Sequence, residues 1–202
     1  MKLIEQEYPD WIIGSPPCTC FSCWQNINFR DLSDEEKNAR MAEGRQHLKF
    51  VVKIYKQRHK AGKYFLHEHP SGATSWREPC IESLLKINGV NCSKADQCMY
   101  GCIAESTKND DRTPVKKPTR FMSNSNVMLE QLSRRCDKSH IHKHLHGKDC
   151  AAAAFYPLGL IHAILKGINL TTARDKMKRK ELREDAKCKE LRVVRWRLFT
   201  TP

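Results

Sequence analysis

The sequence lacks any long apolar run. No stretch of about 18 consecutive apolar residues occurs in the 202 residues, so we expect no membrane-spanning segment. The first 30 residues also lack a basic start followed by an apolar stretch, which is the pattern of a secretory signal, and no internal repeat is present. Ten cysteines occur without an export signal, so we expect reduced thiols and an intracellular location, in cytoplasm or nucleus.

Acidic residues are few compared with basic ones. The chain has 36 Lys and Arg against 23 Asp and Glu, a formal net charge of +13. A net positive charge of this size favours polyanionic partners, above all nucleic acid, although an excess of basic residues can also serve only to keep a protein soluble. Residues 174–197 carry 11 basic and 5 acidic residues, so this segment is either a nucleic-acid-binding arm or a solvated helix.

The first half of the chain predicts strands that alternate with helices. An apolar run at 11–13 ends in Gly-Ser-Pro-Pro and is typical of a buried strand. Ser33 and Glu36 form a capping box at the start of a helix that ends at Gly62. Residues 63–70 (KYFLHEHP) then form a second short strand that stops at a proline.

The rest of the chain continues this alternation. Two further strands are predicted at 90–98 and 119–125, and helical stretches are predicted at 75–87, 127–132, 151–168 and 174–197, the last with an irregular end. Strands separated by helices indicate an α/β fold with a largely parallel sheet in three layers, with helices on both faces. We divide the chain into an α/β domain, 1–168, and a basic extension, 169–202.

Polar residues follow two successive strands. Ligands in open α/β sheets bind at the carboxyl ends of the strands. Cys18 follows the first predicted strand, and Glu68 lies at the end of the second. The order of elements therefore places Cys18 and Glu68 near one crevice.

The segment from Gly14 to Ser22 (GSPPCTCFS) resembles the nucleophile loop of the DNA cytosine-5 methyltransferases, often written Gly-x-Pro-Pro-Cys-Gln-x-Phe-Ser. Thr19 stands where glutamine is usual. In that family the next strand ends in Glu-Asn-Val, of which Glu68 alone matches, and one long helix fills the gap, as here. The resemblance covers roughly residues 1–125 and implies a Rossmann-like, class I methyltransferase-like fold.

The resemblance implies a role for each matching residue. Cys18 would add to carbon 6 of a flipped cytosine, which makes carbon 5 nucleophilic, and Glu68 would hydrogen-bond ring nitrogen 3. The remaining substrate-binding residues would shape the loop or contact the base or a phosphate; they are Ser15, Pro16, Pro17, Thr19, Ser22 and Arg120. Arg120 occupies a place comparable to the family's Gln-x-Arg-x-Arg strand.

The methyl donor implied by the resemblance is S-adenosylmethionine. The family binds it at a glycine-rich turn that precedes the nucleophile loop, whereas this sequence contains no Gly-x-Gly. The chain is therefore expected to be a fragment, one part of a split enzyme or a degenerate relative, or the resemblance is local. A partial sheet would leave an apolar edge for a partner chain or oligomer.

Other interpretations stay open. Cys18 could be an inert thiol and Glu68 a partner of an arginine. The chain could be a non-catalytic nucleic-acid-binding protein of a phage or mobile element, or a small zinc-stabilised module. The cysteines and histidines that could bind zinc are Cys18, Cys20, Cys23, Cys136, His140, His142, His144 and His146. No group among them has a clean paired C-x-x-C arrangement, so the sequence assigns no metal site. Zinc at Cys18 would exclude the nucleophile role.

Overall fold

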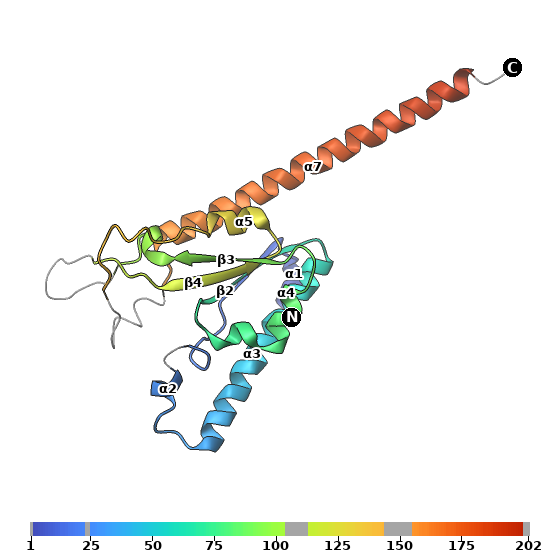
Figure 1. The fold of residues 1–202 in the computed structure, drawn as a ribbon. Helices are drawn as coiled ribbons and strands as arrows, with labels where there is room; N and C mark the ends of the chain where they lie inside the picture. The colour runs from blue at the N-terminus through green and yellow to red at the C-terminus, as the bar shows by residue number, and fades with distance from the viewer. Residues whose placement is uncertain (1, 23–24, 104–112, 144–154, 200–202) are drawn as a thin grey trace.

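The computed structural model describes residues 2–22, 25–103, 113–143 and 155–199 (Figure 1). Its strands are β1 (Trp11–Gly14), β2 (Tyr64–Pro70), β3 (Asn91–Asp96) and β4 (Pro118–Ser123). Its helices are α1 (Lys2–Glu7), α2 (Gln25–Asn28), α3 (Asp34–Lys60), α4 (Pro79–Leu85), α5 (Asn126–Gln131) and α7 (Leu158–Phe199), with 3-10 helices η1 (Thr74–Arg77) and η2 (Gln97–Tyr100).

The four strands form one mixed sheet in the order β1-β2-β4-β3. β1 and β2 pair in parallel, which confirms that the strand before Cys18 neighbours the strand that carries Glu68. The prediction of a largely parallel sheet is wrong, because β4 runs antiparallel to both β2 and β3. In the described part of the β3–β4 connection the only helix is η2, so no crossover helix returns the chain for parallel pairing.

The long helix α3 begins and ends as the sequence predicts. The Ser33 hydroxyl accepts a hydrogen bond from the Glu36 amide at 3.2 Å, and the Glu36 carboxylate accepts one from the Ser33 amide at 2.8 Å. Gly62, at φ +65°, lies in the left-handed region just after the helix, where glycine is favoured. α3 is therefore the long helix of the β1–β2 connection, which also contains the short helix α2.

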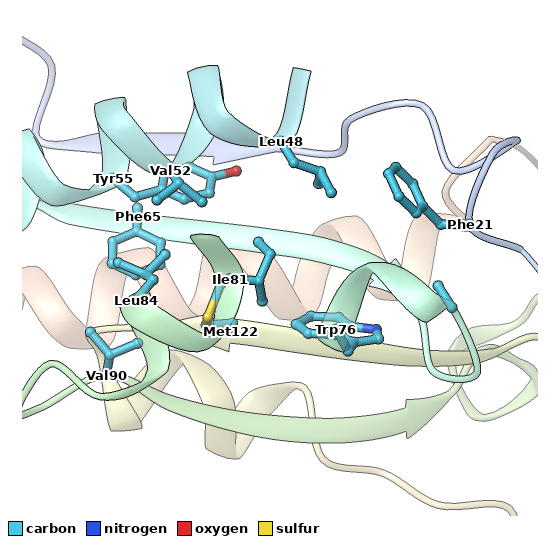
Figure 2. Close-up of a cluster of buried hydrophobic side chains, with 11 residues drawn as sticks. Phe21, Leu48, Val52, Tyr55, Phe65, Trp76, Ile81, Leu84, Val90 and Met122 are labelled. Atoms are coloured by element: carbon cyan, nitrogen blue, oxygen red, sulfur yellow. The ribbon is translucent and has the colours of Figure 1, made fainter. Parts of the chain in front are cut away.

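Hydrophobic side chains pack on both faces of the sheet. Phe65 and Met122 face α3 and α4, and that layer is the cluster of Figure 2. Leu66 and Phe121, which are adjacent to Phe65 and Met122 in β2 and β4, face α5 and α7 instead. Figure 1 shows these two helix pairs on opposite sides of the sheet, which confirms helices on both faces of a mixed α/β fold.

The C-terminal helix α7 is continuous from Leu158 to Phe199, so the prediction of separate helices at 151–168 and 174–197 with an irregular end is wrong. No proline or glycine occurs after Gly167 within it, so no residue breaks the helix. The domain boundary at 168/169 falls inside α7 and stays a prediction, and residues 151–154 lie outside the described residues. None of the described helices is both long and apolar enough to cross a membrane.

The start of α7 packs very closely on η2. A Cβ atom built on Gly159 would overlap the backbone carbonyl oxygen of Tyr100. We predict that Gly159→Ala lowers the free energy of unfolding by about 1–2 kcal/mol, since overpacking against backbone outweighs the helix propensity gained. Urea unfolding measures the change. Gly72→Ala is the matched control, because nothing lies within 4 Å of its added Cβ; equal losses in both variants would contradict the prediction.

Candidate functional site

The loop after β1 is tied to neighbouring elements at three points. The Ser15 hydroxyl donates to Oε2 of Glu68 at 2.5 Å. His69 Nε2 donates to the carbonyl oxygen of Pro16 at 3.0 Å, and the Thr74 amide donates to the carbonyl oxygen of Phe21 at 2.8 Å. These bonds reach the loop from β2 and from the start of η1, so both ends of the Pro-Pro-Cys segment are held.

Cys18 lies at the turn of this loop. Its carbonyl oxygen accepts hydrogen bonds from the amides of Phe21 and Ser22 at 2.9 and 2.8 Å. Phe21 is fully buried in the cluster of Figure 2, whereas Pro17 and Thr19 are exposed. The Cys18 side chain itself is half-buried, so a rigid turn presents its thiol near the surface.

Glu68 is a buried carboxylate with two hydroxyl donors. Its relative exposure is 5%, and Oε2 accepts from Ser15 and, at 3.1 Å, from the hydroxyl of Tyr156. Burial, followed by the charge of Glu68, raises the pKa of Tyr156, so its phenol keeps the proton that it donates. Tyr156 lies 88 residues from Glu68 in the chain and belongs to no recognised motif, so the sequence alone does not point to it.

Cys18 interacts electrostatically with Glu68. Burial is the main cause that raises the pKa of the Cys18 thiol, and the Glu68 carboxylate raises it further. Lys117, which precedes β4, lowers it in part. The two residues singled out from the sequence therefore do lie close together, but in the free protein the thiol is protonated at neutral pH.

Two buried histidines support the opposite side of β2. His69 Nδ1 lies 2.6 Å from the Ser75 hydroxyl, and because Nε2 donates to Pro16, Nδ1 accepts. His67 is fully buried beside the Tyr55 hydroxyl, and burial lowers its pKa to about 3. A Cβ at Gly14 would overlap that hydroxyl, so glycine is required at the end of β1.

Arg120 lies on the face of the sheet opposite to the Glu68 side chain. It pairs with His69 across β2 and β4, whereas Glu68 pairs with Phe121, and side chains of successive residues point to opposite faces. The Arg120 guanidinium lies 4.5 Å from the centroid of the Trp76 ring. The structure thus brings together Ser15, Pro16, Cys18 and Glu68 but leaves Arg120 on the other face of the sheet.

The cysteines and histidines that could hold a metal gather elsewhere. Among the described residues, Cys98, Cys136, His140 and His142 form one group, which includes neither Cys18 nor Cys20. Cys23, His144 and His146 lie outside the described residues. The Cys18 thiol is therefore not a member of the metal-ligand group found in the described chain.

Comparisons with known proteins identify no relative. No protein-family model, no curated protein and no solved structure matches the chain. The functional interpretation therefore depends on the geometry of the chain and on its local resemblance to the nucleophile loop.

The electrostatic link between Cys18 and Glu68 can be tested by thiol alkylation. Glu68→Gln removes a negative charge, so the pKa of Cys18 should fall and iodoacetamide should alkylate Cys18 faster below pH 9. Peptide mass spectrometry measures the rate at each cysteine. Glu43→Gln is the matched control, because Glu43 raises the pKa of Cys20: it should accelerate Cys20 alone. An unchanged rate at Cys18 in Glu68→Gln would contradict the link.

Proposed function

We propose that this chain carries the base-binding half of a cytosine-5 methyltransferase-like site, in which Cys18 adds to carbon 6 of a flipped cytosine. One observation carries the proposal. A thiol on a proline-rigidified loop and a buried carboxylate, from adjacent parallel strands, lie close enough for Glu68 to raise the pKa of Cys18. The parallel β1–α3–β2 unit also supports a partial Rossmann-like, class I methyltransferase-like sheet.

The proposed step forms a bond from the Cys18 sulfur to carbon 6 of cytosine. The thiol proton goes to solvent. The pair of the carbon 5–carbon 6 double bond forms a carbon 4–carbon 5 double bond, and the carbon 4–nitrogen 3 pair goes to nitrogen 3, which takes a proton from solvent and donates it in a hydrogen bond to the Glu68 carboxylate. Carbon 5 is then nucleophilic and takes a proton from solvent. Loss of a proton from carbon 5, departure of the sulfur and return of the nitrogen 3 proton to solvent restore cytosine, and the thiolate takes a proton back from solvent.

Base binding would also activate the thiol. In the free protein the charge of Glu68 helps to keep Cys18 protonated. A protonated nitrogen 3 places positive charge beside that carboxylate, so its effect on Cys18 falls when a base is bound. Ser15 and Tyr156 both donate to Oε2, which fixes the orientation of the carboxylate.

The residues described here do not fit the donor that the resemblance implies. The sequence has no Gly-x-Gly. Two hollows of the described chain are lined by Lys49, Lys53 and Cys80 on one side and by Gln131, Arg134 and His162 on another. Neither hollow is lined by Cys18 or Glu68. The chemistry proposed for this chain is therefore the addition step, which needs no S-adenosylmethionine. A partner chain that supplies the donor would have an edge strand to pair with, since β1 ends the sheet.

The proposed partner is a nucleic acid, DNA by the resemblance. The net charge of +13 supports it, and so does the exposed basic face of α7 that contains Lys176, Arg179 and Arg183. These three residues are spaced by three and four, so they share one side of the helix. On α7, Asp175 is bound to the Tyr64 hydroxyl at 2.8 Å, which ties this part of the helix to β2.

Hydrogen exchange at carbon 5 tests the proposed chemistry directly. We predict slow release of tritium from a single-stranded oligonucleotide that contains 5-tritiated cytosine, because single strands avoid the cost of base flipping. Cys18→Ala should abolish the release, and Glu68→Gln should slow it by about 10²–10⁴-fold, as expected for loss of an acid–base partner. Cys80→Ala, which removes another half-buried thiol, is the control and should match the parent chain.

The result that would overturn this proposal is release that is absent from the parent chain or unchanged in Cys18→Ala. Nucleic-acid binding without any exchange would instead favour the non-catalytic binding protein. A DNA and an RNA oligonucleotide of the same sequence, assayed in parallel, distinguish the two substrate classes.

Salt dependence tests the role of α7. A chain with Lys176, Arg179 and Arg183 all changed to Gln should bind duplex DNA with a log–log salt slope flatter by up to about 2.7, because each phosphate contact contributes about 0.9. Lys49, Lys53 and Lys60 of α3, changed to Gln together, form the control with the same loss of charge. Fluorescence anisotropy measures both slopes. An unchanged slope in the α7 variant would show that these three residues do not contact phosphates and that this part of the helix only faces solvent.

A further inference from the structure

Four metal-ligating side chains meet beside η2. Cys98 lies in η2, whereas Cys136, His140 and His142 follow α5 in the chain. Each offers one sulfur or nitrogen atom, and these four atoms all lie within 4.8 Å of one another. All four residues are half-buried. Cys98 and Cys136 are 38 residues apart in sequence, so tertiary packing, not a local motif, assembles the group.

The distances within the group are those of a metal site close to its bound form. Sγ of Cys136 lies 3.3 Å from Nε2 of His142 and 3.7 Å from Nε2 of His140. Zinc–ligand bonds of about 2.0–2.3 Å in a tetrahedron place ligand atoms about 3.3–3.8 Å apart. The ligand set therefore needs only small movements to surround one ion.

The backbone around Cys136 is fixed independently of any metal. The buried Asp96 carboxylate accepts from the Cys136 amide at 2.9 Å and from Nε of Arg135 at 3.1 Å. The Asp96 amide in turn donates to the carbonyl oxygen of Arg134 at 3.0 Å. Because Asp96 lies two residues before Cys98, these bonds hold the two sulfur ligands next to each other.

The turn after Cys136 has the features of a thiolate ligand loop. The amide of Lys138 donates to Sγ of Cys136 at 3.3 Å, an arrangement that orients the sulfur and stabilises its charge. Lys138 has φ +66°, a left-handed conformation that is unfavourable for a non-glycine residue. This turn reverses the chain so that His140 and His142 come back to Cys136.

We propose that Cys98, Cys136, His140 and His142 bind one structural zinc ion. Two sulfur and two imidazole ligands in a tetrahedral set are typical of zinc, and four protein ligands leave no open position for catalysis. The ion would fasten the segment after α5 to η2 and, through Asp96, to the edge strand β3. The site contains neither Cys18 nor Glu68, so the zinc proposal does not depend on the proposed function.

Metal analysis of the full chain tests the site. After purification with reductant and dialysis, elemental analysis should find one zinc per chain. A strong chelator should lower the melting temperature, and added zinc should restore it, because metal binding supplies folding energy. Cys98→Ser and His142→Ala should each weaken zinc binding by more than about 100-fold. Cys80→Ser and His162→Ala are the controls and should retain the metal, since neither residue belongs to the group.

Cobalt substitution keeps the test decisive if Cys98→Ser does not fold. Cobalt added to the metal-free chain should give the visible absorption of a tetrahedral site with a thiolate-to-metal charge-transfer band. Cys98→His retains four ligands but one thiolate fewer, so it should bind cobalt with about half of that band. A chain that is purified free of metal and whose melting temperature does not rise when zinc is added would overturn the proposal. So would a Cys98–Cys136 disulfide, seen as a loss of two hydrogens in the intact mass.

Discussion

The buried Glu68 carboxylate is the group on which the site depends. It joins three parts of the chain: the loop after β1 through Ser15, strand β2 itself, and the segment just before α7 through Tyr156. A buried carboxylate is costly unless donors surround it, and each donor here comes from a different element. The charge of Glu68 also raises the pKa of Cys18. A change at Glu68 would therefore alter both the packing of the site and the reactivity of the thiol.

Strand β2 supplies different chemistry to the two faces of the sheet. Glu68 faces the side of α7, and its neighbours His67 and His69 face the side of α3 and Trp76. His69 nevertheless holds the same loop as Glu68, because it donates a hydrogen bond to the Pro16 carbonyl oxygen. The next residue is Pro17, so this peptide unit has no N–H group. One strand therefore holds the Pro-Pro-Cys loop from both sides.

The sequence predicts those parts of the site that local pattern encodes. The apolar run before Gly14, the capping box at Ser33 and the strand that ends at Pro70 are enough to predict that the strand before the Cys18 loop neighbours the strand that carries Glu68. It does not predict Tyr156 or Cys98, because each meets its partners only through tertiary packing. The reversed direction of β4 also escapes prediction, since hydrophobic alternation is the same in parallel and antiparallel pairing.

The two buried histidines of β2 make the fold sensitive to acid. Burial lowers the pKa of both His67 and His69, with that of His67 at about 3, against an ordinary value of 6.5. Between these values the unfolded chain binds a proton that the folded chain excludes, so His67 alone removes up to about 1.4 kcal/mol of stability for each pH unit below 6.5. Charging either ring is unfavourable where the rings lie, buried beside Trp76. A compartment of pH near 5 would therefore weaken β2, and with it the attachment of the Cys18 loop, while neutral surroundings keep both in place.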